Sequence, residues 1–309
     1  MKKICFNVKE DGFYGTYWPL KEKTEYAFIA CIGDDANDYL ARTVVKWLHK
    51  QGFNVLTMSP NKKDYGHHNY PLERIEMAIH YLKNYGNSKI GIIGASTTGT
   101  LALTVASMFK DISLTIALTP SDFIWQGFKQ GKKDGCKEWP IKNESLFSYH
   151  GNPLPYMEFC YQHPEYWHVI EKESKIHGDI VNSCKLFDDS EKKNPLQEDM
   201  MIKIENIKGT LILIGAKDDA LWNTDKYIHR MEERLEKKEH DCKMKTYVYE
   251  HGTHYVFPQS LMKLMLPIGS GLFVKLFFKK AREYPKQCLE TRIDIDKKIK
   301  VDLKEWKNS

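Results

Sequence analysis

A serine near the middle of the N-terminal half stands where a nucleophile could act. Ser96 lies in the segment GASTTG, which follows a short apolar run at residues 90–94. An apolar stretch with helical spacing follows it at residues 98–109. A strand that turns sharply into a helix lifts a serine hydroxyl above the edge of a sheet and directs free N–H groups at an oxyanion formed there. The pattern predicts acyl-transfer chemistry with Ser96 as the nucleophile.

The oxyanion would need two backbone donors. The N–H of Thr97 is the first, and the loop at Gly33 and Asp34, after the apolar run 26–32, would supply the second. A simpler interpretation is that Ser96 only caps a helix. The segment also departs from G-x-S-x-G, because Thr98 takes the place of the second glycine. A β-branched residue there is expected to crowd the turn.

A serine hydroxyl needs a base, and the base needs an acid to orient it. The apolar run TLILI at residues 210–214 leads into Asp218 and Asp219, and KTYVY at residues 245–249 leads into His251 and His254. Each residue taken alone is more often structural. Their arrival in the order serine, acid, histidine, each after a predicted strand, is the order that this chemistry shows on parallel sheets.

The choice between neighbours is made on spacing. His254 is preferred because the small residues before it let the loop reach back toward Ser96, and His251 is the alternate. Asp219 is preferred for its spacing to Trp222, with Asp218 as the alternate. The predicted mechanism is attack by Ser96, with His254 as general base and Asp219 orienting the imidazole.

The elements that must position these residues alternate between strand and helix. Continuous apolar runs at 26–32, 53–58, 90–94 and 112–118 are separated by amphipathic segments at 39–50, after Pro71, and at 98–109. Such runs predict a parallel sheet covered on both faces, and right-handed crossovers make it doubly wound. With the serine turn, this predicts an α/β-hydrolase fold in a single domain over residues 1–309.

The alternation breaks between residues 121 and 206. That stretch is rich in tryptophan and proline, has no clear period, and is too long for an ordinary loop. It is predicted to be an insertion that packs over the carboxyl ends of the strands as a lid. The tail 291–309 is predicted to be a surface helix. The long apolar segment 261–278 contains Lys263 and Lys275. We therefore expect a helix that is buried or packs against a partner there, and not a membrane span.

The quoted motifs are similar to a known family. PLE at residues 71–73, the GASTTG turn, GNPLPY at 151–156 and GAKDDALW at 215–222 resemble the C-terminal catalytic domain of acyl-CoA thioesterases and bile acid-CoA:amino acid N-acyltransferases, which is dienelactone-hydrolase-like. The likeness covers roughly residues 10–285. It implies Ser96, Asp219 and His254 as the triad. The amino-terminal β-sandwich of the animal enzymes is not expected, and serine in place of the cysteine of amino-acid-conjugating members favours hydrolysis over acyltransferase activity.

Three functions follow from these residues. The first is a serine hydrolase that cleaves an acyl thioester, as in an acyl-CoA thioesterase. The second is a carboxylesterase or a peptidase/amidase that uses the same triad. The third is a non-catalytic hydrolase-fold protein that binds a ligand, which the departure at Thr98 keeps open.

Composition excludes several other classes. Seven scattered cysteines without a CxxC pair indicate neither a disulfide framework nor a zinc site, and a cytoplasmic location is expected because no apolar leader follows the N-terminus. His67 and His68 are expected to be exposed. A net charge of +5 is a weak indication of an anionic substrate. No metal, cofactor or nucleic acid is expected; the expected partner is a small acyl thioester or ester, and a homodimer is left open.

Overall fold

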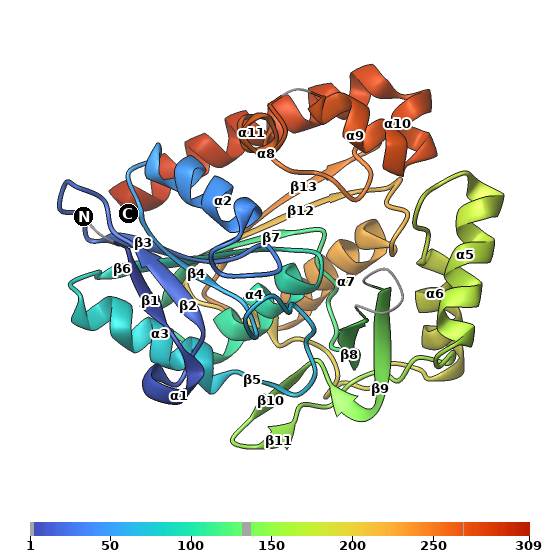
Figure 1. Ribbon diagram of the computed structural model, residues 1–309, viewed down its shortest axis with the longest axis horizontal. Helices are drawn as coiled ribbons and strands as arrows, with labels where there is room; N and C mark the ends of the chain where they lie inside the picture. The colour runs from blue at the N-terminus through green and yellow to red at the C-terminus, as the bar shows by residue number, and fades with distance from the viewer. Residues whose placement is uncertain (1–2, 132–136, 268) are drawn as a thin grey trace.

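The computed structural model describes residues 3–131, 137–267 and 269–309. Its centre is an eight-stranded sheet (Figure 1). In spatial order the strands are β1 (Ile4–Phe6), β2 (Gly15–Trp18), β4 (Asn54–Met58), β3 (Tyr26–Cys31), β6 (Lys89–Ala95), β7 (Ile112–Leu118), β12 (Thr210–Ala216) and β13 (Lys243–Tyr249). Strand β2 is antiparallel to β1 and β4, and every pair from β4 to β13 is parallel. The predicted mostly parallel, doubly wound sheet is confirmed. The antiparallel strands β1 and β2 at one edge are not part of that prediction.

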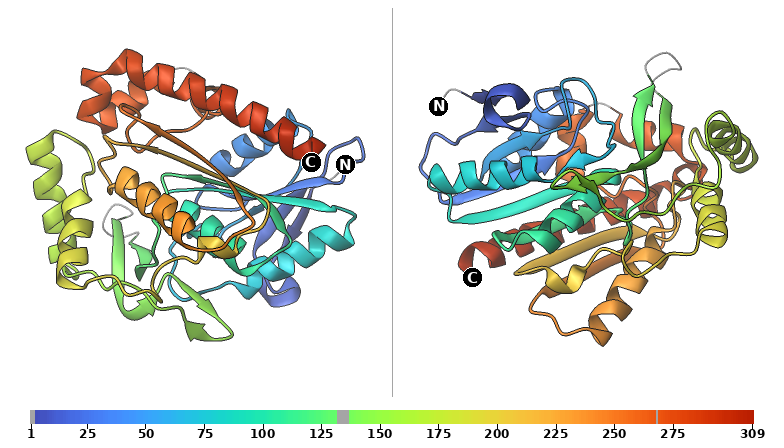
Figure 2. Two further views of the ribbon diagram at one scale, coloured as in Figure 1. Left: turned by 180° about the vertical axis from the view of Figure 1, so that it is seen from behind. Right: turned by 90° about the horizontal axis from the view of Figure 1, so that it is seen from below.

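Helices cover both faces of the sheet (Figures 1 and 2). One face carries α2 (Tyr39–His49), α8 (Gln259–Met265) and α11 (Pro285–Asn308). The other carries α3 (Glu73–Asn84), α4 (Thr97–Met108) and α7 (Thr224–Lys237). The short α1 (Val8–Asp11) follows β1, and α9 (Ser270–Phe277) and α10 (Lys279–Glu283) lie between α8 and α11. The two layers correspond to two separate hydrophobic clusters, one on each face.

The C-terminal helix is a core element and not the surface helix that the tail predicts. Helix α11 begins at Pro285, and Ile295, Ile299 and Trp306 along it are all buried against the sheet. Their spacings of four and seven residues place them on one face of a helix. The apolar residues of the tail are sparse in the sequence, but they are concentrated on that one buried face.

The insertion at 121–206 forms several small elements. They are the hairpin β8 (Gln126–Gly131) and β9 (Lys137–Ser145), the strands β10 (Phe147–Tyr149) and β11 (Asn152–Pro153), the helices α5 (Glu165–His177) and α6 (Cys184–Lys193), and the turn η1 (Ile204–Asn206). Cys136 and its neighbours at 132–135 lie outside the described residues. Strand β10 also pairs with β5 (Tyr70–Pro71). Side chains such as Trp125 and Phe187 belong to the same cluster as the sheet helices, so the insertion shares the main core.

Charged side chains fix the insertion to helix α7. The Arg230 guanidinium donates two hydrogen bonds to the Asp122 carboxylate, at 2.7 and 2.6 Å, and a third to Glu191 at 2.8 Å. Because Asp122 begins the insertion and Glu191 lies in α6, one arginine holds both parts. A bidentate pair of this kind fixes geometry more firmly than a single ion pair.

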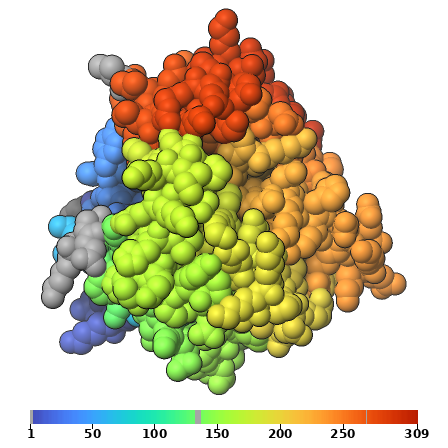
Figure 3. All heavy atoms as spheres, turned by 90° about the vertical axis from the view of Figure 1, so that its right-hand side faces the viewer, coloured from blue at the N-terminus to red at the C-terminus, as the bar shows by residue number. Residues whose placement is uncertain are grey.

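The insertion also meets the C-terminal helices, as Figure 3 shows for the yellow-green and orange-red segments. The Ile180 N–H donates to the Phe277 carbonyl at 2.8 Å, and the Lys279 N–H donates to the Asp179 carboxylate at 2.7 Å. Within the described ranges no single helix is long and apolar enough to cross a membrane. Helices α8 and α9 together reach that length and composition, but they are bent by 93°.

His67 is buried, which corrects the expectation that both adjacent histidines are exposed. Its side chain packs against Tyr70, Phe128 and Phe147 and is 1% exposed, whereas His68 pairs with Glu144 at the surface. Burial lowers the pKa of His67 to about 4. Within the described part of the chain no group of histidine, cysteine, aspartate and glutamate side chains could hold a metal ion.

The buried His67 makes acid stability testable. Its pKa is lowered in the folded chain, so the unfolded chain binds the extra proton first and stability is lost as pH falls from about 6.5 toward 4. The loss attributable to His67 should be about 3 kcal/mol at most. Urea unfolding at pH 7 and pH 4.5 should show a smaller pH effect in His67→Phe than in the wild type. An unchanged pH effect would mean that His67 does not stay neutral in the folded chain.

Candidate active site

Ser96 lies at a strained turn between β6 and α4. Its φ and ψ angles of 59° and −129° are outside the regions that non-glycine residues usually occupy. The Ser96 N–H donates to the Leu118 carbonyl of β7 at 2.8 Å, and its carbonyl accepts from the N–H groups of Gly99 and Thr100. Ser96 makes no side-chain capping bond to the helix. The sharp turn that the sequence predicts is therefore present, and helix capping does not explain the serine.

Two glycines allow the close approach that this turn requires. A Cβ atom on Gly94 would lie 1.9 Å from the Thr98 carbonyl oxygen, and one on Gly99 would lie 2.9 Å from the Leu118 carbonyl oxygen. The role expected of the second motif glycine therefore falls on Gly99, one residue later. Thr98 does not crowd the turn: its hydroxyl donates to the Ala95 carbonyl at 2.9 Å and accepts from the Ala95 N–H at 3.0 Å.

An aspartate and a histidine meet at the ends of β12 and β13. The Nδ1 atom of His254 lies 2.9 Å from both carboxylate oxygens of Asp219. Asp219 also accepts from the Leu221 N–H at 2.9 Å and from the Thr224 hydroxyl at 2.5 Å. Both side chains are buried. These bonds fix the acid and orient the imidazole, which leaves Nε2 as the free ring nitrogen.

Asp218 and His251, the alternate acid and histidine, lie beside the Asp219–His254 pair and make different contacts. Asp218 accepts from the N–H groups of Gly252 and Thr253, at 2.9 and 2.7 Å, and contacts the His251 ring nitrogen at 3.2 Å. His251 stacks on Tyr284, with ring centroids 3.7 Å apart. Asp218 thus holds the backbone of the loop that carries His254, and His251 is turned toward α11 instead of the cavity beside Ser96.

The second ring nitrogen of His254, Nε2, is buried close to the cavity wall at Trp222. Among the described residues, no group hydrogen-bonds to the buried His254 Nε2. Trp222 packs edge-on against the His254 ring, at 5.0 Å between centroids, and lines the cavity that Ser96 also lines. Serine–histidine hydrogen bonds are often long before substrate binds. Trp222 therefore links the His254 ring to the cavity, and within the described residues Nε2 forms no hydrogen bond to Ser96 or to any other group.

Only part of the predicted oxyanion site is free to act. Thr97 opens helix α4, and N–H groups in a first helical turn lack acceptors within their own helix. The Asp34 N–H, in contrast, already donates to the Asp38 carboxylate at 2.8 Å. The Asp38 carboxylate, which caps helix α2, therefore competes with a substrate oxyanion for the Asp34 N–H. The Asp34 N–H is therefore already engaged, and we retain Gly33, with φ of 108°, as the candidate donor in that loop.

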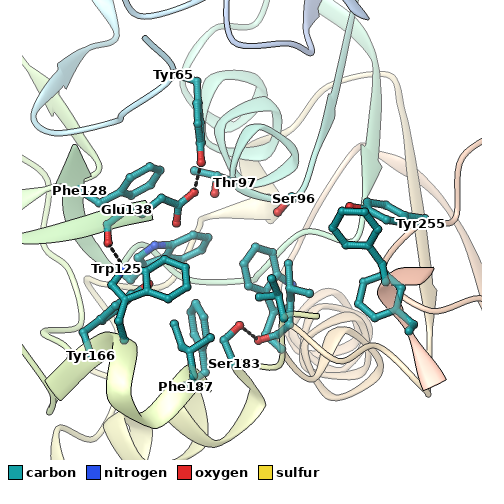
Figure 4. Close-up of a pocket in the computed structure, with 17 residues that line it drawn as sticks. Tyr65, Ser96, Thr97, Trp125, Phe128, Glu138, Tyr166, Ser183, Phe187 and Tyr255 are labelled. Carbon is teal, nitrogen blue, oxygen red and sulfur yellow. Dashed lines mark hydrogen bonds between the residues drawn. The ribbon is translucent and has the colours of Figure 1, made fainter. Parts of the chain in front are cut away.

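The cavity at Ser96 is small and mostly aromatic. Its volume is about 240 Å³, and it is bounded by the β6–α4 turn, the insertion and the C-terminal helices (Figure 4). Aromatic side chains from the insertion make up much of the wall: Trp125, Phe128, Tyr166, Trp167 and Phe187. Trp222, Tyr255, Phe277 and Phe278 add rings from the other side.

Two polar residues in the wall are missing from the sequence-based prediction. Glu138 of β9 accepts a hydrogen bond from the Tyr65 hydroxyl, and both side chains line the cavity (Figure 4). Burial raises the pKa of the Glu138 carboxyl, while the bond from Tyr65 acts in the opposite direction. Neither residue belongs to a motif, and 73 positions separate them. No signal in the sequence alone links them.

The sheet order, the serine turn after β6, the acid after β12 and the histidine after β13 together define an α/β-hydrolase. The chain belongs to the BAAT / acyl-CoA thioester hydrolase C-terminal family, whose model matches residues 70–261. This range contains Ser96, Asp219 and His254, and it is narrower than the span over which the sequence resembles the family.

Solved structures with a similar arrangement include several hydrolases. An esterase from Pyrococcus furiosus is 15% identical, with 90% of this chain and 93% of the other covered and a TM-score of 0.46. An α/β-hydrolase enzyme from a Medee basin deep-sea metagenome library is 14% identical, with 83% and 84% covered and a TM-score of 0.45. A putative dienelactone hydrolase from Klebsiella pneumoniae is 9% identical, with 79% and 82% covered and a TM-score of 0.46. A comparison with curated proteins gave no match.

Proposed function

We propose that the chain is a serine hydrolase that cleaves an acyl thioester through an acyl-enzyme on Ser96. The observation that carries the proposal is the buried Asp219–His254 pair, with an unpartnered Nε2, beside a cavity that contains a serine in a strained turn. Family membership supports the thioester as the reacting bond. A strained, half-buried serine turn is a feature that folded proteins keep mainly where it serves function.

The proposed reaction has two halves. In the first, His254 Nε2 takes the proton from Ser96 Oγ as the oxygen attacks the carbonyl carbon, the carbon–sulfur bond breaks, and the thiol leaves with that proton. In the second, His254 takes a proton from water, the hydroxide adds to the acyl-enzyme, and the carboxylic acid leaves as Ser96 regains its proton. Asp219 keeps the imidazole oriented and stabilises its charged form. The Thr97 N–H stabilises the oxyanion in both halves.

A second function, cleavage of a simple carboxylic ester, has one observation in its favour. Among the described residues that line the cavity, none carries a positive charge. The phosphates of a coenzyme A thioester would therefore have to lie outside the cavity, where the net charge of +5 on the chain acts only diffusely. A small ester has no such requirement.

A comparison of leaving groups separates the two. We expect kcat/KM for an acyl-CoA to exceed that for the p-nitrophenyl ester of the same chain by about tenfold or more, since each tenfold needs only about 1.4 kcal/mol of extra transition-state binding. The N-acetylcysteamine thioester of the same acid is the control, because it keeps the reacting bond and lacks the phosphates. A preference for the p-nitrophenyl ester over both thioesters would refute thioester cleavage as the main activity.

A further inference from the structure

An acidic side chain lies in the wall of the Ser96 cavity. Glu138 lines the cavity together with Ser96 and Thr97, and Figure 4 shows its carboxyl on the Thr97 side of the space. Its position is fixed from two directions. The Trp167 indole N–H donates to the Glu138 carbonyl at 2.5 Å, and Glu138 is paired with Gln130 across the β8–β9 hairpin. These contacts fix the backbone of Glu138, and the hydrogen bond from the Tyr65 hydroxyl holds its carboxyl at the cavity.

Among the described residues that line the cavity, this carboxyl has no positively charged neighbour. Of the described lining residues, Glu138 is the single one that carries a formal charge. Its described polar contact is the hydrogen bond from Tyr65, which reaches one of the two carboxyl oxygens. The burial that raises its pKa works against the charged form. The Tyr65 hydroxyl offsets only part of this cost, and a cation bound beside the carboxylate would offset more of it.

Aromatic rings make up most of the remaining wall. Trp125, Trp167 and Trp222 all line the cavity, with Phe128 and Tyr166 near the insertion side. The face of an aromatic ring attracts a cation, and a group of rings with a carboxylate is a common way to bind an ammonium group without hydrating it. Rings alone would suit any apolar chain. Rings combined with one carboxyl that lacks a positively charged partner among the described lining residues suit a substrate group that ends in a positive charge.

We propose that the Ser96 cavity selects a substrate whose cavity-bound group carries a quaternary or protonated amine, with Glu138 and the surrounding rings as the recognition site. This inference rests on the proposed function only for the reaction that follows binding. The ammonium group can belong to either side of the scissile bond, namely to the acyl chain or to the leaving group. The chemistry of recognition is the same in both cases, and substrates charged on one side or the other distinguish them.

The test uses pairs of substrates that differ only in charge. One pair is an acylthiocholine and the thioester in which carbon replaces the quaternary nitrogen, so that the cation is on the leaving group. The other pair places the same trimethylammonium group, or its carbon isostere, at the end of the acyl chain of a p-nitrophenyl ester. In one of the pairs kcat/KM should favour the cation by about tenfold or more. Equal rates within both pairs would overturn the proposal.

Variants assign the effect to Glu138. In Glu138→Gln the preference for the cation should fall to about twofold or less, because the rings remain and the carboxylate is gone. Glu144→Gln is the matched control: it lies in the same strand and pairs with His68 away from the cavity, so it should keep the wild-type ratio. A full preference that survives in Glu138→Gln would contradict the assignment.

Binding without turnover keeps this inference separate from the proposed function. Tetramethylammonium should quench or shift the tryptophan fluorescence of the wild type saturably, and more weakly in Glu138→Gln, even if no ester or thioester is cleaved. The wild-type measurement stands by itself where the variant does not fold. Absence of saturable binding to a folded wild type, together with equal rates in both pairs, refutes the cation site whatever the outcome for Ser96.

Discussion

Replacing Ser96 by alanine should lower kcat, for every ester or thioester that the wild type turns over, by about 10⁴- to 10⁶-fold. The oxygen that forms the acyl-enzyme is lost, and His254 has no hydroxyl to activate. KM should change far less, because the aromatic cavity that holds the substrate is untouched. Steady-state kinetics on the best substrate of the wild type provide the measurement.

The Ser96→Ala variant must be shown to fold. Ser96 makes its structural contacts through backbone atoms, namely to Leu118, Gly99 and Thr100, and alanine keeps all of them. The thermal midpoint should therefore stay close to that of the wild type. Activity within tenfold of the wild type in a folded variant would mean that another residue carries the chemistry.

The second large effect is expected at Asp219. Asp219→Asn should lower kcat by about 10³- to 10⁴-fold, since an amide can donate to His254 Nδ1 and favour the wrong tautomer. Asp218→Asn should have a much smaller effect. Its remaining carbonyl oxygen can still accept from the N–H groups of Gly252 and Thr253, which hold the loop of His254.

We expect the two histidines to differ in the same way as the two aspartates, with the larger loss of activity at His254. His254→Ala should be nearly as inactive as Ser96→Ala, because residues that act as one unit do not contribute additively. His251→Ala removes a ring stacked on Tyr284 and should act mainly on stability. The reverse ranking, with Asp218 and His251 the sensitive pair, would show that the wrong neighbours have been assigned to the reaction.

The parallel sheet and the order of candidate residues could be predicted because each depends on local pattern. Apolar runs such as residues 112–118 specify buried strands, and residues that follow parallel strands meet at one edge of the sheet. Of the two neighbouring acids, Asp219 is the one bonded to His254. The sequence separates the two acids by spacing alone, whereas in the structure Asp218 is occupied by the backbone N–H groups of Gly252 and Thr253.

The features that could not be predicted depend on contacts between distant segments. Glu138 and Tyr65 meet only because the insertion folds back over the sheet, and His67 is buried by Phe128 and Phe147 of the same insertion. The competition of Asp38 for the Asp34 N–H depends on a helix cap that the motif does not reveal. Gly99 stands one residue beyond the usual motif position, and the close approach to Leu118 that gives it that role is visible only in the structure.

The central claim is that Ser96 forms a covalent acyl-enzyme, and a fluorophosphonate probe tests it most directly. After incubation with the probe, peptide mass mapping of the wild type should place one adduct on Ser96, and Ser96→Ala should carry none there. Labelling should be much slower in Asp219→Asn, since His254 then activates the serine poorly. A folded wild type that turns over substrate but carries no adduct on Ser96, or carries it on another residue, would contradict the account.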